Sequence, residues 1–165
     1  MKLYFSIFLT VCLVLGACKK KGFKSISETD EIGNAIDHPD PTDWVEDEGS
    51  WSNKIDQLMG EGCELSAYGN TCEIVMNPAY PNPFSTWTQA YFNTTDSCLV
   101  NILLVDKKNN VYLKDCYQLT GGYGIIGVDA VALELSTNTY YRLYYDFSNS
   151  NGTSFYKGHG DIKTL

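Results

Sequence analysis

The segment Asn77-Pro78-Ala79-Tyr80-Pro81-Asn82-Pro83-Phe84 decides how the rest of the chain is interpreted. Its three prolines fix the backbone angle φ, remove N–H donors and push the residues before them into extended geometry. A helix or a central strand is incompatible with this stretch. We therefore predict a stiff, extended lead into a β-sheet, with a β-domain after it and a delivery and tether region before it.

The composition is that of one globular domain with an acidic surface. The chain has 165 residues, of which 44% are hydrophobic and 19% are charged. Its 12 Tyr, 7 Phe and 3 Trp favour strands over helices, because such side chains pack well on a pleated surface. The formal net charge is −8, and the stretch from Glu28 to Glu48 contains no Lys or Arg. Nucleic acid needs a basic footprint, so we expect no nucleic-acid partner.

Residues 1–17 predict a lipoprotein signal peptide. Lys2 is followed by an apolar run from Leu3 to Leu15, which is shorter than the roughly twenty residues that a permanent transmembrane helix needs. Leu15-Gly16-Ala17-Cys18 resembles the bacterial lipobox. The resemblance implies that the Cys18 thiol is diacylated and that Cys18 becomes the first residue of the mature chain, held durably by several acyl chains. The alternative is an ordinary secretory signal cut near Ala17, which would leave Cys18 as a free thiol.

This N-terminus predicts lipid anchoring in the envelope of a Gram-negative bacterium, at the outer membrane. Lys19, Lys20 and Lys21 directly follow the cysteine and would lie at the headgroup level, where anionic lipid attracts cations. Some lipoproteins that are exported to the cell surface carry acidic residues at these positions. We therefore favour the periplasmic face over the cell surface.

Residues 18–50 predict a lipidated, disordered tether. Their low hydrophobicity and high charge bury too little apolar area to offset the entropy of the chain. The carboxylates around His38 are closely spaced, as in a calcium loop, but they lack its spacing and its central glycine. We expect a solvated acidic linker and no metal site.

The cysteines after Cys18 predict disulfides. Cys63, Cys72, Cys98 and Cys116 are an even number in an exported chain, and they lack the paired spacing of a zinc site or a redox motif. Three pairings are compatible with the sequence. We favour Cys63 with Cys72 and Cys98 with Cys116, because each pair would close a short loop.

Residues 51–165 predict an all-β domain. Short apolar runs recur at roughly ten-residue spacing with turn chemistry between them, which indicates an antiparallel sandwich. Asn109 is expected to adopt a left-handed conformation in the turn after Asp106. Trp51 to Met59 fits either a helix or a strand. The predicted strands are residues 72–76, 87–92, 98–105, 111–117, 128–135, 139–147 and 154–165, and residues 93–97 and 148–153 are predicted turns.

Residues 78–165 resemble the immunoglobulin-like domain of the flagellar hook-capping protein and the related C-terminal domains of type IX secretion cargo. The matching pieces are Tyr80-Pro81-Asn82-Pro83-Phe84, the strand from Val100 to Asp106 and Thr139-Tyr140-Tyr141-Arg142-Leu143. The resemblance implies a small immunoglobulin-like β-sandwich that serves in sorting, adhesion or structure and not in catalysis.

No stretch predicts an enzyme or a cofactor site. Gly122-Tyr123-Gly124-Ile125-Ile126-Gly127 has the spacing of a dinucleotide loop but lacks the surrounding strand–helix–strand unit, so we expect a flexible inter-strand loop. His159 has no nucleophile elbow to serve and is expected at a rim or bulge.

Tyr140, Arg142 and Tyr144 lie on one face of a predicted strand and could form a platform for a glycan or a protein partner. Cross-strand packing on a solvated face is the alternative. The sequence therefore predicts a non-catalytic, membrane-anchored lipoprotein that presents an immunoglobulin-like module for protein interaction or envelope structure. Two alternatives stay open: a glycan-binding lipoprotein, and a type IX cargo-like protein that is cleaved near Met76 to Tyr80.

Overall fold

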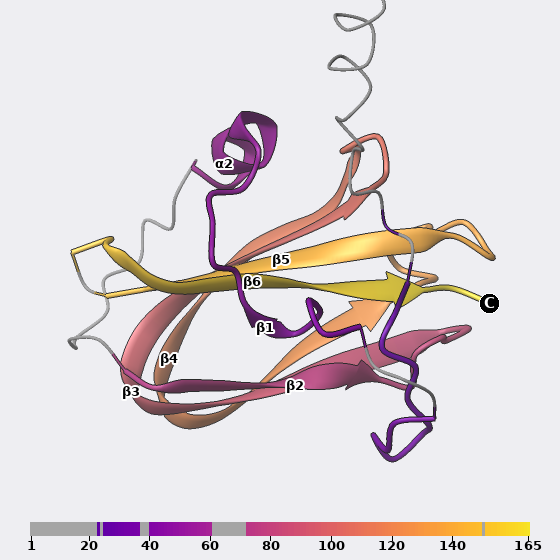
Figure 1. Ribbon diagram of the computed structural model, residues 1–165, viewed down its shortest axis with the longest axis horizontal. Helices are drawn as coiled ribbons and strands as arrows, with labels where there is room; N and C mark the ends of the chain where they lie inside the picture. Colours follow the sequence, from indigo (N-terminus) through magenta and orange to yellow (C-terminus); the bar gives the residue numbers. More distant parts are fainter. Residues whose placement is uncertain (1–22, 24, 37–39, 61–71, 150) are drawn as a thin grey trace, which may run out of the picture.

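A single antiparallel β-sheet dominates the computed structural model, which describes residues 23, 25–36, 40–60, 72–149 and 151–165 (Figure 1). The predicted all-β, antiparallel fold is confirmed. The stretch from Trp51 to Met59, which fitted either a helix or a strand, contains a seven-residue helix. No helix in the described ranges is long and apolar enough to cross a membrane. The elements are β1 (Val45–Glu46), α2 (Asn53–Met59), β2 (Ile74–Tyr80), β3 (Trp87–Asp106), β4 (Val111–Asp129), β5 (Tyr140–Ser148) and β6 (Ser154–Lys163).

The long strand β3 bends the sheet over its own core. Its first half pairs with β2 and with the second half of β4, while its second half pairs with β5 and with the first half of β4. A register shift between Thr94 and Ser97 separates the two halves. Such a bulge bends a strand and increases its twist, so the two halves of the sheet can face each other. The predicted turn over residues 93–97 is wrong, because these residues continue β3.

The proline segment brings the two ends of the sheet together. Phe84 donates its N–H to the carbonyl of Lys163 at 2.9 Å, and its own carbonyl accepts from Leu165 at 2.8 Å. The Asn82 side chain donates to the carbonyl of Asp161 at 2.9 Å and accepts from the N–H of Lys163 at 3.0 Å. The result is one nearly closed, barrel-like sheet in the order β1-β6-β5-β3-β2, where the sequence had predicted the two separate sheets of an immunoglobulin-like sandwich.

The core lies between the two halves of this bent sheet. The predicted core face of β5 is confirmed, because Tyr141, Leu143, Tyr145 and Phe147 are all fully buried. A second, smaller cluster lies on the opposite face of β3 and β5, where α2 packs Ile55 and Met59 against Leu103 and Tyr144. The sheet is therefore covered on both faces at β5 but on one face only at β2.

The N-terminal strap, residues 25–36 and 40–50, packs on the sheet. Trp44 is 4% exposed and stacks on Tyr145, and β1 pairs with β6. The predicted disordered tether is therefore wrong over this strap, because one buried tryptophan and several backbone hydrogen bonds offset its polar composition. Residues 1–22, which include the predicted signal peptide and Cys18, lie outside the described residues, and so does His38.

Two further predictions for the end of β4 are corrected. The glycine-rich stretch from Gly122 to Gly127 is paired strand and not a flexible loop. Gly124 faces the core, where a Cβ atom would lie 2.1 Å from the ring of Phe92. Residues 130–138, which the sequence had partly assigned to a strand, form turns. Asn109 does adopt the left-handed conformation, with φ 64°.

Candidate functional site

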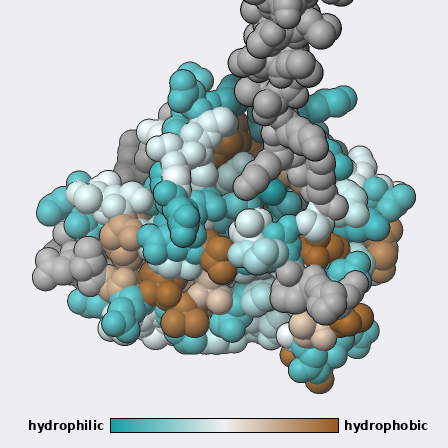
Figure 2. All heavy atoms as spheres, in the orientation of Figure 1, coloured by the Kyte–Doolittle hydropathy of each residue, from teal (hydrophilic) through white to brown (hydrophobic). Residues whose placement is uncertain are grey.

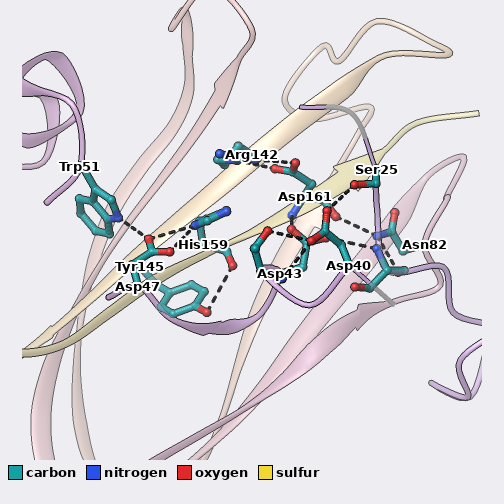
Figure 3. Close-up of polar contacts among 12 residues, drawn as sticks. Ser25, Asp40, Asp43, Asp47, Trp51, Asn82, Arg142, Tyr145, His159 and Asp161 are labelled. Atoms are coloured by element: carbon teal, nitrogen blue, oxygen red, sulfur yellow. Dashed lines mark hydrogen bonds and ion pairs between the residues drawn. The ribbon is translucent and has the colours of Figure 1, made fainter. Parts of the chain in front are cut away.

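A polar network joins the N-terminal strap to β6 (Figure 3). The buried carboxylate of Asp43 accepts hydrogen bonds from the backbone N–H groups of Ser27 and Asp161, both at 3.2 Å. Asp40 accepts from the Ser25 hydroxyl within the strap. These bonds help the acidic strap to lie against β6, which carries a buried acid of its own, Asp161.

Asp43 is the most perturbed acid of this network. Burial, followed by the negative charges of Asp161 and Asp40, raises the pKa of Asp43 from 3.8 to about 7. The carboxyl group therefore changes charge near neutral pH. One of its hydrogen bonds lies within the strap, at Ser27, and the other holds the strap to β6 at Asp161, so this titration acts on the docking of the strap.

Arg142 neutralises the second buried acid. Its guanidinium donates two hydrogen bonds to Asp161, at 2.5 and 2.7 Å, in the fork geometry that arginine and carboxylate share. Burial alone would lower the pKa of Arg142, but the hydrogen bonds and charge of Asp161 outweigh it and raise that pKa. The ring of Phe23 covers the guanidinium at 4.5 Å. Arg142 is thus committed to a structural ion pair.

A polar pocket of about 260 Å³ opens beside this ion pair, between residues 47–52 and the strands β5 and β6. Asp47 is one of its lining residues, accepting from Trp51 Nε1 at 2.5 Å and contacting His159 Nδ1 at 2.8 Å. Burial alone would raise the pKa of Asp47, but the hydrogen bonds from His159 and Trp51 lower it below its ordinary value. An ionised carboxylate only accepts, so Nδ1 of His159 carries the proton in this contact. The pocket is lined by residues 47–52 together with Arg142, Tyr144 and His159.

The pocket offers donors, acceptors and an aromatic edge to a small polar ligand. His159 lies in β6, and its Nδ1 contact with Asp47 orients the ring, as a carboxylate orients the histidine base of hydrolases. In this structure the contact has a structural role. Ser52 caps α2 by accepting from the N–H of Ile55. Within the described ranges, no group of three or more His, Cys, Asp and Glu side chains is arranged to hold a metal ion.

The predicted platform of Tyr140, Arg142 and Tyr144 is not an open surface. Tyr144 is 8% exposed, and Trp51 packs against its ring at 5.1 Å between centroids. Arg142 holds Asp161, and Tyr140 lies beside two lysine ammonium groups, at 4.7 and 5.3 Å from its ring. Packing with α2 and the strap therefore occupies most of this face, and only the rim of the pocket stays accessible.

A different set of aromatic side chains lies on the outer face of β2, β3 and β4, where Tyr80 and Tyr91 are half-buried and Gly33 of the strap lies against the Tyr80 ring. Tyr80, Tyr91 and Tyr123 form a ladder across these strands, with centroid distances of 5.1 Å and 4.9 Å. Tyr123 is 62% exposed at the end of this ladder. We call this surface the tyrosine face; its members are Val75, Asn77, Tyr80, Trp87, Gln89, Tyr91, Asn93, Tyr123 and Ile125.

Trp87 gives the tyrosine face a flat platform. Its indole lies over Gly127, where a Cβ atom would meet the ring at 2.2 Å, and 46% of the residue is exposed. None of the nine members is charged, but Asp129 pairs with Trp87 across the β3–β4 ladder and borders the face. Figure 2 shows several separate hydrophobic spots among hydrophilic residues on the face in view, most of them in its lower half. The face is thus an aromatic surface of neutral side chains with the carboxylate of Asp129 at its border beside Trp87.

The predicted cysteine pairs do not form. Cys72 and Cys98 are free thiols, whereas Cys116 is disulfide-bonded, so neither Cys63–Cys72 nor Cys98–Cys116 is present. Cys98 lies opposite Leu119 across the β3–β4 ladder, and Cys116 lies opposite Asn101, so the two are three residues out of register. Cys63 and Cys18 lie outside the described residues.

The comparisons with known proteins give a partial structural likeness. No protein-family model matches the chain, and no curated protein matches it. A solution structure of the sensor domain of the anti-sigma factor RsgI4 in Pseudobacteroides cellulosolvens is similar with TM-score 0.40 and 16% identity, over 58% of this chain and 76% of that one. A longer version of that sensor domain gives TM-score 0.38 and 16% identity, over 58% of this chain and 92% of the other. A likeness at this level carries no functional argument.

Sequence analysis missed the residues that organise both surfaces. Trp44 and Val45 interrupt the acidic run with two apolar residues, which is the one local signal that the strap docks. Gly158 and Gly160 leave room for that docking, because a Cβ atom would meet the carbonyl of Val45 at 2.1 Å or the ring of Trp44 at 2.2 Å. The tyrosine face could have been found from the alternation of Trp87, Gln89 and Tyr91 with Thr88, Ala90 and Phe92.

Proposed function

We propose that the chain is a lipid-anchored, non-catalytic envelope protein that binds a neutral glycan through its tyrosine face. The lipobox-like Leu15-Gly16-Ala17-Cys18 supports the anchor. The exposed aromatic ladder and the flat indole of Trp87 support binding. The observation that carries the proposal is the exposed part of this aromatic face, where Trp87 is 46% and Tyr123 is 62% exposed.

The chemistry of this face fits a sugar ring. A pyranose has an apolar C–H side, which buries well against an aromatic plane, and a polar rim of hydroxyl groups. Trp87 offers the plane, and Gln89 and Asn93 on the same outer face of β3 offer amide donors and acceptors for hydroxyls. The absence of charge from the nine members fits a neutral ligand better than an acidic or basic protein surface.

The acidic rest of the protein fits this assignment. A net charge of −8 repels anionic polymers, and a neutral polysaccharide meets no such repulsion. The anchor would add avidity, because many copies on one membrane can engage one polymer together. The proposed protein therefore holds a neutral polysaccharide close to the membrane.

The type IX cargo alternative meets a structural difficulty. Its cleavage region, Met76 to Tyr80, lies inside β2, which is paired with β3. Cleavage there would cut a folded strand that also carries Tyr80 of the tyrosine face. We therefore propose that the chain stays intact, and detection of a fragment that begins between Met76 and Tyr80 in the native host would contradict this.

The experiment is co-sedimentation with insoluble neutral polysaccharides, followed by a glycan array to name the sugar. The double variant Trp87→Ala/Tyr123→Ala should lose binding by at least about tenfold, since interface aromatics are typical hot spots. Tyr117→Ala is the matched control, because Tyr117 is also an exposed tyrosine of β4 but lies off the tyrosine face. Equal binding by the double variant, or capture of an envelope protein with no glycan bound, would overturn the assignment.

A further inference from the structure

Two thiols meet where β2 joins β3. Cys98 is 0% exposed in the main core, and the half-buried Cys72 packs against the same core. The two side chains are hydrogen-bonded to each other, and burial, followed by this bond, raises the pKa of Cys98 to about 12. The contact is therefore between sulfur atoms and is not only a proximity of strands.

The backbone around these thiols is held on both sides. Glu73 and Thr95 exchange hydrogen bonds directly beside Cys72, at 3.1 Å to the Thr95 hydroxyl and 3.3 Å to the Glu73 carbonyl. Ile74 then pairs with Thr94 in the β2–β3 ladder. Cys98 follows the register shift between Thr94 and Ser97, and its side chain lies in the main core against which Cys72 packs. The fold thus fixes the partner of each thiol.

We propose that Cys72 and Cys98 form a disulfide in the mature, exported protein. This bond replaces both pairings that sequence spacing had favoured, and it leaves the disulfide at Cys116 untouched. It depends on export to an oxidising compartment and is independent of glycan binding. Its structural effect is to tie the start of the edge strand β2 to the central strand β3.

The chemistry is a thiol–disulfide exchange with a disulfide oxidoreductase of the envelope. The Cys72 thiolate attacks the oxidoreductase disulfide, which forms a mixed disulfide and releases one oxidoreductase thiolate. The Cys98 thiolate then attacks the Cys72 sulfur and displaces the second. The chain loses two electrons and two protons, and the oxidoreductase leaves as a dithiol. Because Cys98 is fully buried once folded, the exchange takes place while the core closes.

The test is disulfide mapping on the full-length protein purified from the membrane fraction of its native host. Cells are quenched with maleimide before lysis, so that free thiols are capped and cannot exchange. Trypsin is unsuitable, because no Lys or Arg lies between Lys54 and Lys107 and three cysteines would share one peptide. Chymotrypsin can separate all four cysteines by cutting after Tyr68, Phe92 and Tyr112.

The expected result is a linked pair of peptides that contain Cys72 and Cys98, with no maleimide on either residue. Maleimide on Cys72 or Cys98 after denaturation would overturn the proposal, and so would a linkage of Cys72 to Cys63 or of Cys98 to Cys116. A Cys72→Ser variant gives a second measurement, since it should expose Cys98 to maleimide in denaturant with complete labelling. Unchanged labelling of Cys98 in that variant would show that Cys98 has another partner.

Discussion

The two outer faces of this sheet carry similar aromatic side chains, but those on one face are covered and those on the other reach solvent. On β5, Tyr140 and Tyr144 point outward and are covered by α2, by Trp51 and by neighbouring lysines. On β3 and β4, Trp87 and Tyr123 also point outward, and they stay exposed. The difference lies in which face the N-terminal strap and α2 cover, since the strand patterns are alike.

This contrast shows that an aromatic residue at an outward strand position does not by itself define a binding surface. Sequence alternation locates the outward positions, but a segment from elsewhere in the chain decides which of them meet solvent. Here that segment is acidic and looks like a linker. The covered face should therefore respond to mutation with changes in stability, and the tyrosine face with changes in binding.

The largest effect is expected at the anchor of the strap. Trp44→Ala removes a buried indole that stacks on Tyr145 and fills the space over Gly160. We expect a loss of about 4 kcal/mol in the free energy of unfolding, typical of a large aromatic cut to alanine in a core. Urea denaturation followed by circular dichroism measures it. A loss below about 1 kcal/mol would mean that the strap is not part of the fold.

A slightly smaller loss is expected from the buried ion pair. Arg142→Ala leaves the carboxylate of Asp161 buried without its partner, which should cost about 3 kcal/mol. The double variant Arg142→Met/Asp161→Leu serves as the control, because it removes both charges at once. It should recover a large part of the loss in the same denaturation experiment, and a double variant less stable than Arg142→Ala would contradict this account of the pair.

The next effect is a dependence of stability on pH. The pKa of Asp43 is about 7 in the folded protein, well above its ordinary value of 3.8, so between these values the folded state binds a proton that the unfolded state has lost. The free energy of unfolding should therefore fall as pH rises through this window, by up to about 1.4 kcal/mol per pH unit from this group.

Asp43→Asn should flatten that slope. The slope will not vanish, because burial raises the pKa of Asp146 and Asp161 as well. Thermal or chemical denaturation at several pH values between 4 and 8 gives the comparison. An unchanged slope in Asp43→Asn would place the titrating group elsewhere.

Local patterning predicted the part of the fold that local sequence controls. The alternation in β5 identified Tyr141, Leu143, Tyr145 and Phe147 as core, and Asn109 identified the left-handed turn residue. The proline segment was predicted as an extended lead into a sheet; its first residues, Asn77 to Tyr80, instead end the edge strand β2, and Phe84 then bonds to β6.

The rest depends on contacts that are distant in sequence. Asp43 meets Asp161 across 118 positions, and Trp44 lies over Gly160, so an acidic stretch gained partners that composition cannot show. The cysteine pairing failed for the same reason. Spacing along the chain favours short loops, whereas the register of β3 against β2 and β4 decides which thiols meet.

The smallest effect on stability is expected on the tyrosine face. Trp87→Ala removes a half-exposed indole from a solvent face, so the free energy of unfolding should change by less than about 1 kcal/mol. The same denaturation series measures it beside Trp44→Ala. A loss as large as that of Trp44→Ala would mean that the tyrosine face, like the covered face, is structural.

The three tryptophans allow the most direct test, because they sample three places: Trp44 in the core, Trp51 on the covered face and Trp87 on the tyrosine face. Their indole N–H resonances, assigned with single Trp→Phe variants, can be followed while soluble neutral oligosaccharides are added. We predict that the Trp87 resonance shifts in a saturable manner while those of Trp44 and Trp51 stay in place. A shift of Trp51 with Trp87 unchanged, or no shift at any of the three, would contradict a glycan-binding tyrosine face.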